Sequence, residues 1–151
     1  MSETPTSTET AVLAAADALI ASFARHDRDA YFAAFAPHAS FVFHHVSEAL
    51  PTRAAYEALW RQWERDDGFA VLGCESSGRA VQCLGDVAIF THNVRTQVST
   101  HAGRETLVER ETIVFARDGA DWIAVHEHLS PHACVAVQHD VNEANALEAS
   151  A

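Results

Sequence analysis

The segment from Trp122 to Ser130 constrains the fold more than any other part of this chain. Apolar residues alternate there with polar or ionisable ones, which is the period of a β-strand rather than of a helix. Strict alternation divides the segment into two faces, one carrying Ile123, Val125, Glu127 and Leu129 and the other carrying Trp122, Ala124, His126, His128 and Ser130. A carboxylate on the more apolar face is costly unless it has a partner or a function. The surroundings of Glu127 are therefore the main question about function.

The composition fits one acidic domain. A chain of 151 residues has the length of a single domain, and its 8 Phe, 3 Trp and 2 Tyr supply enough apolar volume for one core. The 21 acidic residues outnumber the 10 basic ones and give a formal charge of −11. This charge disfavours nucleic acid and anionic membranes as partners, because no basic stripe is present to contact phosphates.

The sequence shows no targeting or membrane-spanning segment. Residues 1–10 lack the basic and apolar regions of a signal peptide, and no apolar run is long enough to cross a bilayer. The three cysteines, Cys74, Cys83 and Cys134, lack Cys-x-x-Cys spacing, which favours reduced, buried thiols, although Cys74 and Cys83 can also pair across a hairpin. We therefore expect a cytoplasmic protein.

Helical periodicity is confined to the first half of the chain. Residues 1–8 are expected to form a disordered lead-in, and Thr8 or Thr10 is expected to cap the first helix. Apolar residues at helical spacing predict one buried stripe on that helix. The expected helices are Glu9–Arg25, Arg28–Phe35, which Pro37 terminates, and a third that Thr52 caps and Asp66-Asp67-Gly68 ends.

Most of the remaining chain is typical of strands. They are expected over Ser40–His45, Phe69–Ser76, Arg79–Leu84, Asp86–Thr100, Arg104–Arg117 and Asp121–Ser130. Two of them exceed the usual ~5–6 residues, which indicates a strongly curved or bulged sheet. The element order predicts an α+β fold with helices on one face of an antiparallel sheet. We expect a single domain over residues 9–131 and a tail over residues 132–151.

Four segments, in this order, resemble the nuclear transport factor 2-like superfamily, and more narrowly its SnoaL-like and ketosteroid-isomerase-homologue branch. They are Tyr-Phe-Ala-Ala-Phe-Ala at 31–36, Thr-Arg-Ala-Ala-Tyr-Glu-Ala-Leu-Trp at 52–60, Gly-Asp-Val-Ala-Ile-Phe at 85–90 and Trp-Ile-Ala-Val-His-Glu-His-Leu-Ser-Pro at 122–131. The last segment is also similar to the association domain of calcium/calmodulin-dependent kinases. The resemblance covers residues 9–131.

The resemblance implies a cone-shaped, cystatin-like fold, with three N-terminal helices packed on a strongly curved antiparallel sheet and a pocket on its concave side. It also implies a homodimer formed through the outer sheet face. Family activities include isomerases, dehydratases, polyketide cyclases and epoxide hydrolases, so the fold does not determine the function. Ketosteroid isomerases carry a proton-shuttling Asp on the first strand. Residues 40–45 contain no carboxylate, and Phe43 or His44 stands near that place, which argues against steroid isomerisation by that route.

Strand pairing assigns a candidate pocket face. A tight connection near Ala102-Gly103 sets His92 opposite Thr112, and a turn at Asp118–Asp121 sets Thr112 opposite Glu127. The concave face is then expected to carry Phe90, His92, Val94, Arg110, Thr112, Val114, Val125, Glu127 and Leu129. A bulge in any long strand would shift this assignment downstream.

His92, Arg110 and Glu127 then form a polar group in apolar surroundings. Arg110 is expected to bind a carboxylate or enolate oxygen through its planar guanidinium, with Glu127 or His92 as the general base. A structural alternative is a buried Arg110–Glu127 ion pair that only satisfies itself. His44, at the expected pocket mouth, is either a further acid or base or a partly exposed histidine at a strand end.

Aromatic residues and a second histidine pair complete the set of candidates. Tyr31, Tyr56 and Trp60 are expected between the helices and the sheet, where they contact a ligand together with Thr112. On the opposite face, the spacing of His126 and His128 is one that some metal sites use, although a third ligand must come from another strand. A mixed aromatic and polar outer face suits a dimer interface better.

These patterns lead to three functional hypotheses. The first is a pocket for a small hydrophobic ligand with a carbonyl group, which the domain isomerises, dehydrates or cyclises by proton transfer. No glycine-rich phosphate loop, dinucleotide fingerprint or nucleophile motif is present, so we expect no cofactor. The second is a non-catalytic module for dimerisation or ligand sensing. The third is metal-dependent hydrolysis through His126 and His128.

Overall fold

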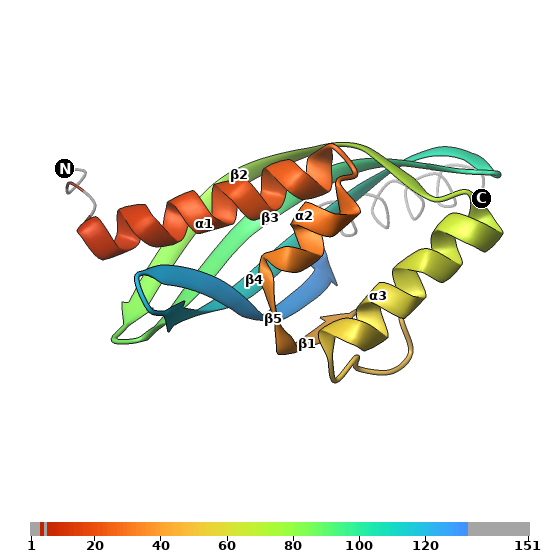
Figure 1. Cartoon of the computed structure of the whole chain (residues 1–151). Helices are drawn as coiled ribbons and strands as arrows, with labels where there is room; N and C mark the ends of the chain where they lie inside the picture. Colours follow the sequence, from red (N-terminus) through yellow and green to blue (C-terminus); the bar gives the residue numbers. More distant parts are fainter. Residues whose placement is uncertain (1–3, 5, 133–151) are drawn as a thin grey trace, which may run out of the picture.

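The computed structural model describes residue 4 and residues 6–132 (Figure 1). Its elements, in chain order, are α1 (Ser7–Ala24), α2 (Arg28–Ala33), β1 (Phe35–Phe43), α3 (Arg53–Gln62), a π-helical turn η1 (Trp63–Asp67), β2 (Ala70–Leu84), β3 (Val87–Thr100), β4 (Gly103–Asp118) and β5 (Asp121–Pro131). The expected C-terminal tail, apart from His132, lies outside the described residues.

Side-chain caps define where the helices begin. Thr6, rather than the predicted Thr8 or Thr10, accepts a hydrogen bond from the Glu9 N–H, so α1 begins at Ser7. Thr52 caps α3 through the Ala55 N–H, as predicted. The π-helical turn ends at Gly68, whose φ of 65° favours glycine.

The described strands form one sheet in the order β1-β5-β4-β3-β2. The α+β prediction is confirmed, and α3 follows β1 in the order in which the elements were predicted. Two details differ. Strand β1 pairs with β5 in parallel, so the sheet is mixed rather than antiparallel. Strand β2 is continuous where two strands were predicted, because register shifts absorb the turn signal around Gly78.

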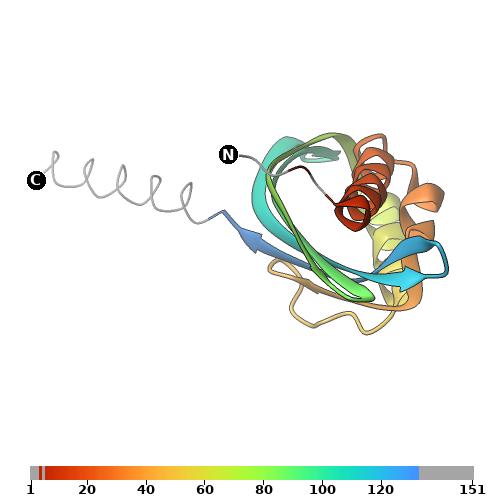
Figure 2. The same ribbon diagram turned by 90° about the vertical axis from the view of Figure 1, so that its left-hand side faces the viewer.

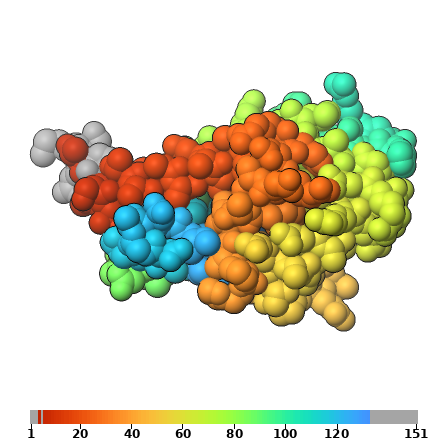
Figure 3. Space-filling model, in the orientation of Figure 1, coloured from red at the N-terminus to blue at the C-terminus, as the bar shows by residue number. Residues whose placement is uncertain are grey.

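The sheet is strongly curved and the helices lie on its concave side (Figure 2). Helices α1 and α2 and the β1–α3 segment present an almost continuous surface over that side in the space-filling view (Figure 3). The space between the helices and the sheet is therefore the interior of the domain.

Aromatic side chains fill most of this interior. The largest fully buried side chains include Trp60, Tyr31, Phe35, Phe41, Phe90 and Phe115. Helix α1 adds Val12, Ala16 and Leu19. Contrary to the expectation from the sequence, α1 is apolar enough by length and composition to cross a membrane, and 22% of its residues are buried in the domain.

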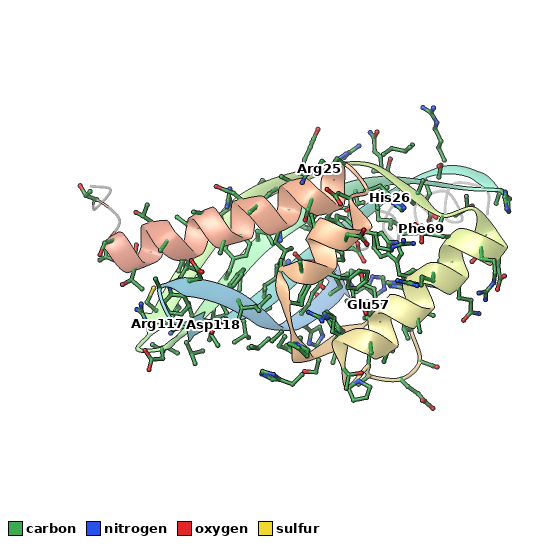
Figure 4. All side chains as sticks on the ribbon, viewed as in Figure 1. Arg25, His26, Glu57, Phe69, Arg117 and Asp118 are labelled. Atoms are coloured by element: carbon green, nitrogen blue, oxygen red, sulfur yellow. The ribbon has the colours of Figure 1, made fainter. Side chains whose placement is uncertain are left out.

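His26 fastens the corner between α1 and α2 to the rest of the domain. Its Nδ1 accepts a hydrogen bond from the Val71 N–H (2.9 Å), and its Nε2 lies 2.8 Å from Oε2 of Glu64 in η1. The ring also contacts Phe69 edge-on, and Figure 4 shows the two side chains next to each other. These contacts hold the helices at a fixed height above the sheet.

We predict that Phe41→Ala costs about 3–5 kcal/mol of unfolding free energy, the range for removing a buried aromatic ring. Phe41 is fully buried and contacts Phe35, Phe43 and Tyr56. Urea denaturation measures the loss, with Leu84→Ala as the control, because Leu84 is 55% exposed and should change stability by less than about 0.5 kcal/mol. Equal losses in the two variants would contradict this view of the core.

Candidate functional site

Three acidic side chains and one histidine meet on the concave face. The register sets His92 of β3 opposite Glu111 of β4, Val94 opposite Glu109, and Ile113 of β4 opposite Glu127 of β5. All three glutamates and His92 are buried. The prediction that His92 and Glu127 share one face of the sheet agrees with this arrangement.

Arg110 and Thr112 lie on the opposite, convex face, so the prediction that they line the pocket is wrong. The β3–β4 connection pairs Thr100 with Gly103, one residue away from the predicted register. Arg110 is exposed and lines a shallow surface groove with Thr112. Arg110 forms no ion pair with Glu127, so the alternative hypothesis of a buried Arg110–Glu127 ion pair is wrong as well.

A bulge in β5 explains why Glu127 nevertheless faces inward. The predicted β4–β5 register holds as far as Phe115 opposite Ala124, and then Val125 is inserted as an extra residue. Trp122 and Ala124 therefore share the buried face with Glu127, contrary to strict alternation. The misplaced β3–β4 turn shifts the predicted register by one residue, and the bulge at Val125 shifts it by one more. The two shifts cancel for His92 and Glu127, which share a face as predicted. They do not cancel for β4, whose residues point to the faces opposite to those predicted.

The buried polar groups line a small cavity of about 40 Å³, enough for a few water molecules. Leu19, Ile20 and Phe23 of α1 form its apolar side. A second cavity of about 70 Å³ lies next to it and shares the lining residues Phe23, Tyr56, Thr96, Glu109 and Leu129. It continues toward His45 and Trp63. We call the two neighbouring cavities the pocket, and we call the wall that carries Glu111 and Glu127 its floor.

One chain of hydrogen bonds reaches the floor from the helices. The Tyr31 hydroxyl donates to Oε2 of Glu127 at 3.1 Å, and the Tyr56 hydroxyl lies 3.1 Å from the Tyr31 hydroxyl. Since the Tyr31 proton is used on Glu127, Tyr56 is the donor in the second bond. Both tyrosines line the cavity, where they were predicted to contact a ligand.

A second chain reaches the floor from the sheet. His92 Nε2 lies 2.7 Å from Oε1 of Glu111, and its Nδ1 lies 2.7 Å from the Ser76 hydroxyl. Burial lowers the pKa of His92 to about 4, so its ring is neutral at pH 7. A neutral ring with Nε2–H donates to Glu111 and accepts from Ser76 through Nδ1, which satisfies both partners.

The two chains end at the carboxyl groups of Glu127 and Glu111, which line the same cavity and raise each other's cost of ionisation. Burial, followed by the negative charge of Glu111, raises the pKa of Glu127 well above its ordinary value. Burial also raises the pKa of Glu111 to about 7. Of the two buried carboxyl groups, Glu127 therefore holds its proton more strongly, while Glu111 accepts a hydrogen bond from His92.

The described residues that line the two cavities include glutamates but no arginine. All ten basic residues of the chain are arginines, and none of them is among the described residues that line the two cavities. An anionic ligand would meet repulsion from the glutamates. The arrangement therefore suits a neutral or cationic ligand and not the carboxylate that an inward Arg110 would have bound.

The remaining sequence candidates occupy different environments. His44 lies at the edge of the pocket, where its Nε2 is 2.5 Å from Oε2 of Glu109. Trp60 is 1% exposed in the core and lines only the second cavity. His126 contacts the Ser40 hydroxyl through Nδ1 (2.8 Å), and its ring centroid is 6.4 Å from that of His128. Neither His126 nor His128 belongs to a three-residue metal-ligand group among the described residues.

Glu109, Glu111 and Ser76 were missed by sequence reasoning. The signal was present in Val108-Glu-Arg-Glu-Thr112, where the alternation of a strand puts both glutamates on one face and Arg110 on the other. One position of error in the β3–β4 turn assigned the arginine to the pocket and the glutamates to solvent.

Comparisons with known proteins agree on the fold. The chain is similar to the CaMKII hub of S. rosetta, at 25% identity and a TM-score of 0.68 over 85% of this chain and 100% of that one. It is similar to a protein of unknown function in nutrient uptake from Rhodospirillum rubrum (18% identity, TM-score 0.69, 80% and 98% covered). It is also similar to a protein from Cytophaga hutchinsonii (11% identity, TM-score 0.70, 85% and 100% covered). The last two are described as NTF2-like.

No curated protein matches the chain. A family model described as a SnoaL-like domain matches residues 12–134, which include every described helix and strand except the start of α1. The chain therefore belongs to the SnoaL-like domain family, and its fold is that of NTF2-like proteins.

Proposed function

We propose that this domain binds a small, uncharged molecule with a carbonyl group and catalyses a proton transfer on it, as an isomerase, dehydratase or cyclase. The observation that carries the proposal is the meeting of two hydrogen-bonded chains at one pair of carboxyl groups, Glu127 and Glu111, on the wall of the cavity. Fold membership alone would not support it, because this fold carries many functions.

The two carboxyl groups have complementary roles in this proposal. Glu127 is held in its acid form and is a hydrogen-bond donor, so it can protonate or polarise a ligand carbonyl, as buried carboxylic acids do in other enzymes. Glu111 accepts a hydrogen bond from His92 and loses its proton more readily than Glu127, so it can remove a proton beside that carbonyl. One group gives a proton while its neighbour takes one.

The surrounding residues orient this pair rather than react. Tyr31 and Tyr56 fix the Glu127 carboxyl from the helices, and Ser76 fixes the His92 ring from β2. Leu19, Ile20 and Phe23 form an apolar side of the same cavity, and a low local dielectric strengthens each polar contact. A ligand for this cavity is small and mainly apolar.

The expected catalytic signal is exchange of α-protons in a simple ketone. Enzyme freed of metal with EDTA is incubated with butan-2-one or cyclohexanone in D2O, and deuterium incorporation is followed by NMR. We expect wild-type protein to accelerate exchange and Glu111→Gln to lower the acceleration by about 10²-fold or more, the usual contribution of a general base. Arg110→Ala is the matched control, because Arg110 lies on the convex face.

Exchange that is equal in wild-type protein and Glu111→Gln would overturn the catalytic role. If ketone resonances and protein amides around the cavity do not shift on mixing, binding of this ligand class is also excluded. Native mass spectrometry of the purified protein then identifies any small molecule that co-purifies.

We predict that the fold loses stability as pH rises above about 6.5, and that Glu127→Gln reduces this loss. The raised pKa of Glu127 means that the folded state holds a proton that the unfolded chain has already released, so stability is present at low pH and falls as pH rises through the folded pKa. His92 does not contribute in this window, because its pKa of about 4 affects stability only below about pH 6.5.

Urea denaturation at each pH measures the effect. Glu127→Gln retains an acceptor for Tyr31 but cannot ionise, so at pH 9 it should be more stable than wild type by at least about 1 kcal/mol, the scale of one pKa unit. Parallel pH profiles for the two proteins would contradict the assignment of a raised pKa to Glu127.

A non-catalytic role is the second candidate. The name of the S. rosetta relative, a CaMKII hub, favours a domain whose task is assembly, with the convex face of the sheet as the contact between copies. In that case the carboxyl pair only stabilises the interior or senses a ligand. The exchange experiment separates the two, because assembly requires no acceleration of proton transfer.

A further inference from the structure

We propose that His44, His45 and Glu109 form a binding site for a divalent transition-metal ion, with Zn²⁺ as the best fit, at the edge of the pocket. This site is separate from the Glu127–Glu111 pair and does not depend on the proton-transfer function. The metal hypothesis therefore moves from His126 and His128 on the convex face to the mouth of the cavity.

The donor atoms are already close together. One ligand atom from each of the three residues lies within 4.8 Å of the other two, and His44 Nε2 is 2.5 Å from Oε2 of Glu109. A tetrahedral zinc ion with bonds of about 2.0–2.1 Å separates its ligand atoms by about 3.3 Å. The separations of the donor atoms, from 2.5 Å to at most 4.8 Å, lie on either side of that spacing.

The end of β1 explains why two neighbouring histidines face one carboxylate. Successive residues of a strand point to opposite faces, but β1 ends at Phe43, and the Val46 N–H closes a turn onto the Phe43 carbonyl at 3.1 Å. The turn brings the two imidazole rings to 5.2 Å from each other. The chain leaves the strand where both rings can approach Glu109.

Aromatic neighbours orient the second histidine. The His45 ring stacks on Phe43, with centroids 5.7 Å apart and planes 10° apart, and it lies 5.8 Å from the Trp63 ring. Residues that fix the orientation of a ligand ring usually strengthen metal sites. The surroundings of His45 therefore prepare it for coordination.

Burial and charge also favour a cation here. Glu109 is 5% exposed, and Glu111 and Glu127 line the same cavity, with no arginine among its described lining residues. A buried carboxylate requires compensation, and its described hydrogen-bond partner is the His44 ring. Both histidines are exposed to solvent, so an ion can enter from outside while its charge acts on the buried glutamate.

Three protein ligands leave one position of a tetrahedral ion open, which is the pattern of catalytic rather than structural zinc. Glu109 and His45 also line the second cavity. A ligand oxygen in that cavity can therefore take the fourth position. The chemical class that this site selects is a small molecule with an oxygen donor, held at the mouth while its other end lies near the floor.

The experiment is isothermal titration of metal-free, untagged protein with ZnCl2. We expect one saturable site per chain, and at least tenfold weaker binding in His45→Ala and in Glu109→Gln. His45→Ala is the decisive variant, because it leaves the His44–Glu109 contact in place and its fold is checked by thermal melting. The matched control is His128→Ala, which removes an exposed histidine of the convex face and should bind Zn²⁺ as wild type does.

Cobalt provides a second readout. Co²⁺ at a tetrahedral nitrogen and oxygen site should give visible absorption bands in wild type and His128→Ala that are lost in His45→Ala. The proposal is overturned if wild type shows no saturable site, or if His45→Ala binds as tightly as His128→Ala. In either case the His44–Glu109 contact is only a hydrogen bond at the edge of the pocket.

Discussion

The burial of two neighbouring carboxyl groups, Glu127 and Glu111, on the wall of one cavity is the constraint around which the interior is arranged. Two neighbouring buried carboxyl groups cannot both ionise without a large electrostatic cost, so one keeps its proton. The geometry of this pair depends on both layers of the fold, because Tyr31 and Tyr56 come from helices and His92 and Ser76 come from strands. The helices lie on the concave side of the curved sheet (Figure 2). Their distance from the sheet therefore determines whether Tyr31 reaches Glu127.

The packing around these groups maintains that distance. Phe41 and Phe43 of β1 contact Tyr56, and Trp60 contacts Tyr31, so the two tyrosines have little freedom to move. His26 fastens the α1–α2 corner to η1 and β2. An aromatic interior of this kind buries the carboxyl pair away from bulk solvent, and this burial raises the pKa values of Glu127 and Glu111.

The pocket changes in character from floor to mouth. The floor holds neutral and acidic groups in hydrogen-bonded chains, and the mouth holds exposed histidines beside Glu109. Membership of the SnoaL-like domain family accounts for the frame that carries these groups, but not for their identity, because one frame carries many chemistries. The acidic lining and the absence of arginine among the described lining residues are what select a neutral or cationic ligand.

The sequence alone was sufficient for the elements and the fold class. Helical and strand periods, the Thr52 cap and the stop at Gly68 are local features, and each depends on residues only a few positions apart. The inward position of Glu127 was predicted as well, but only because the misplaced β3–β4 turn and the bulge at Val125 offset each other. Tertiary structure decided the partners of Glu127. Register between strands depends on one residue in a turn and on the bulge at Val125, and a shift of one position exchanges the two faces of β4. Arg110 was therefore placed inside by the sequence pattern, while the folded sheet puts Glu109 and Glu111 there, because pairing of distant strands is settled by packing over the whole face and not by local periodicity.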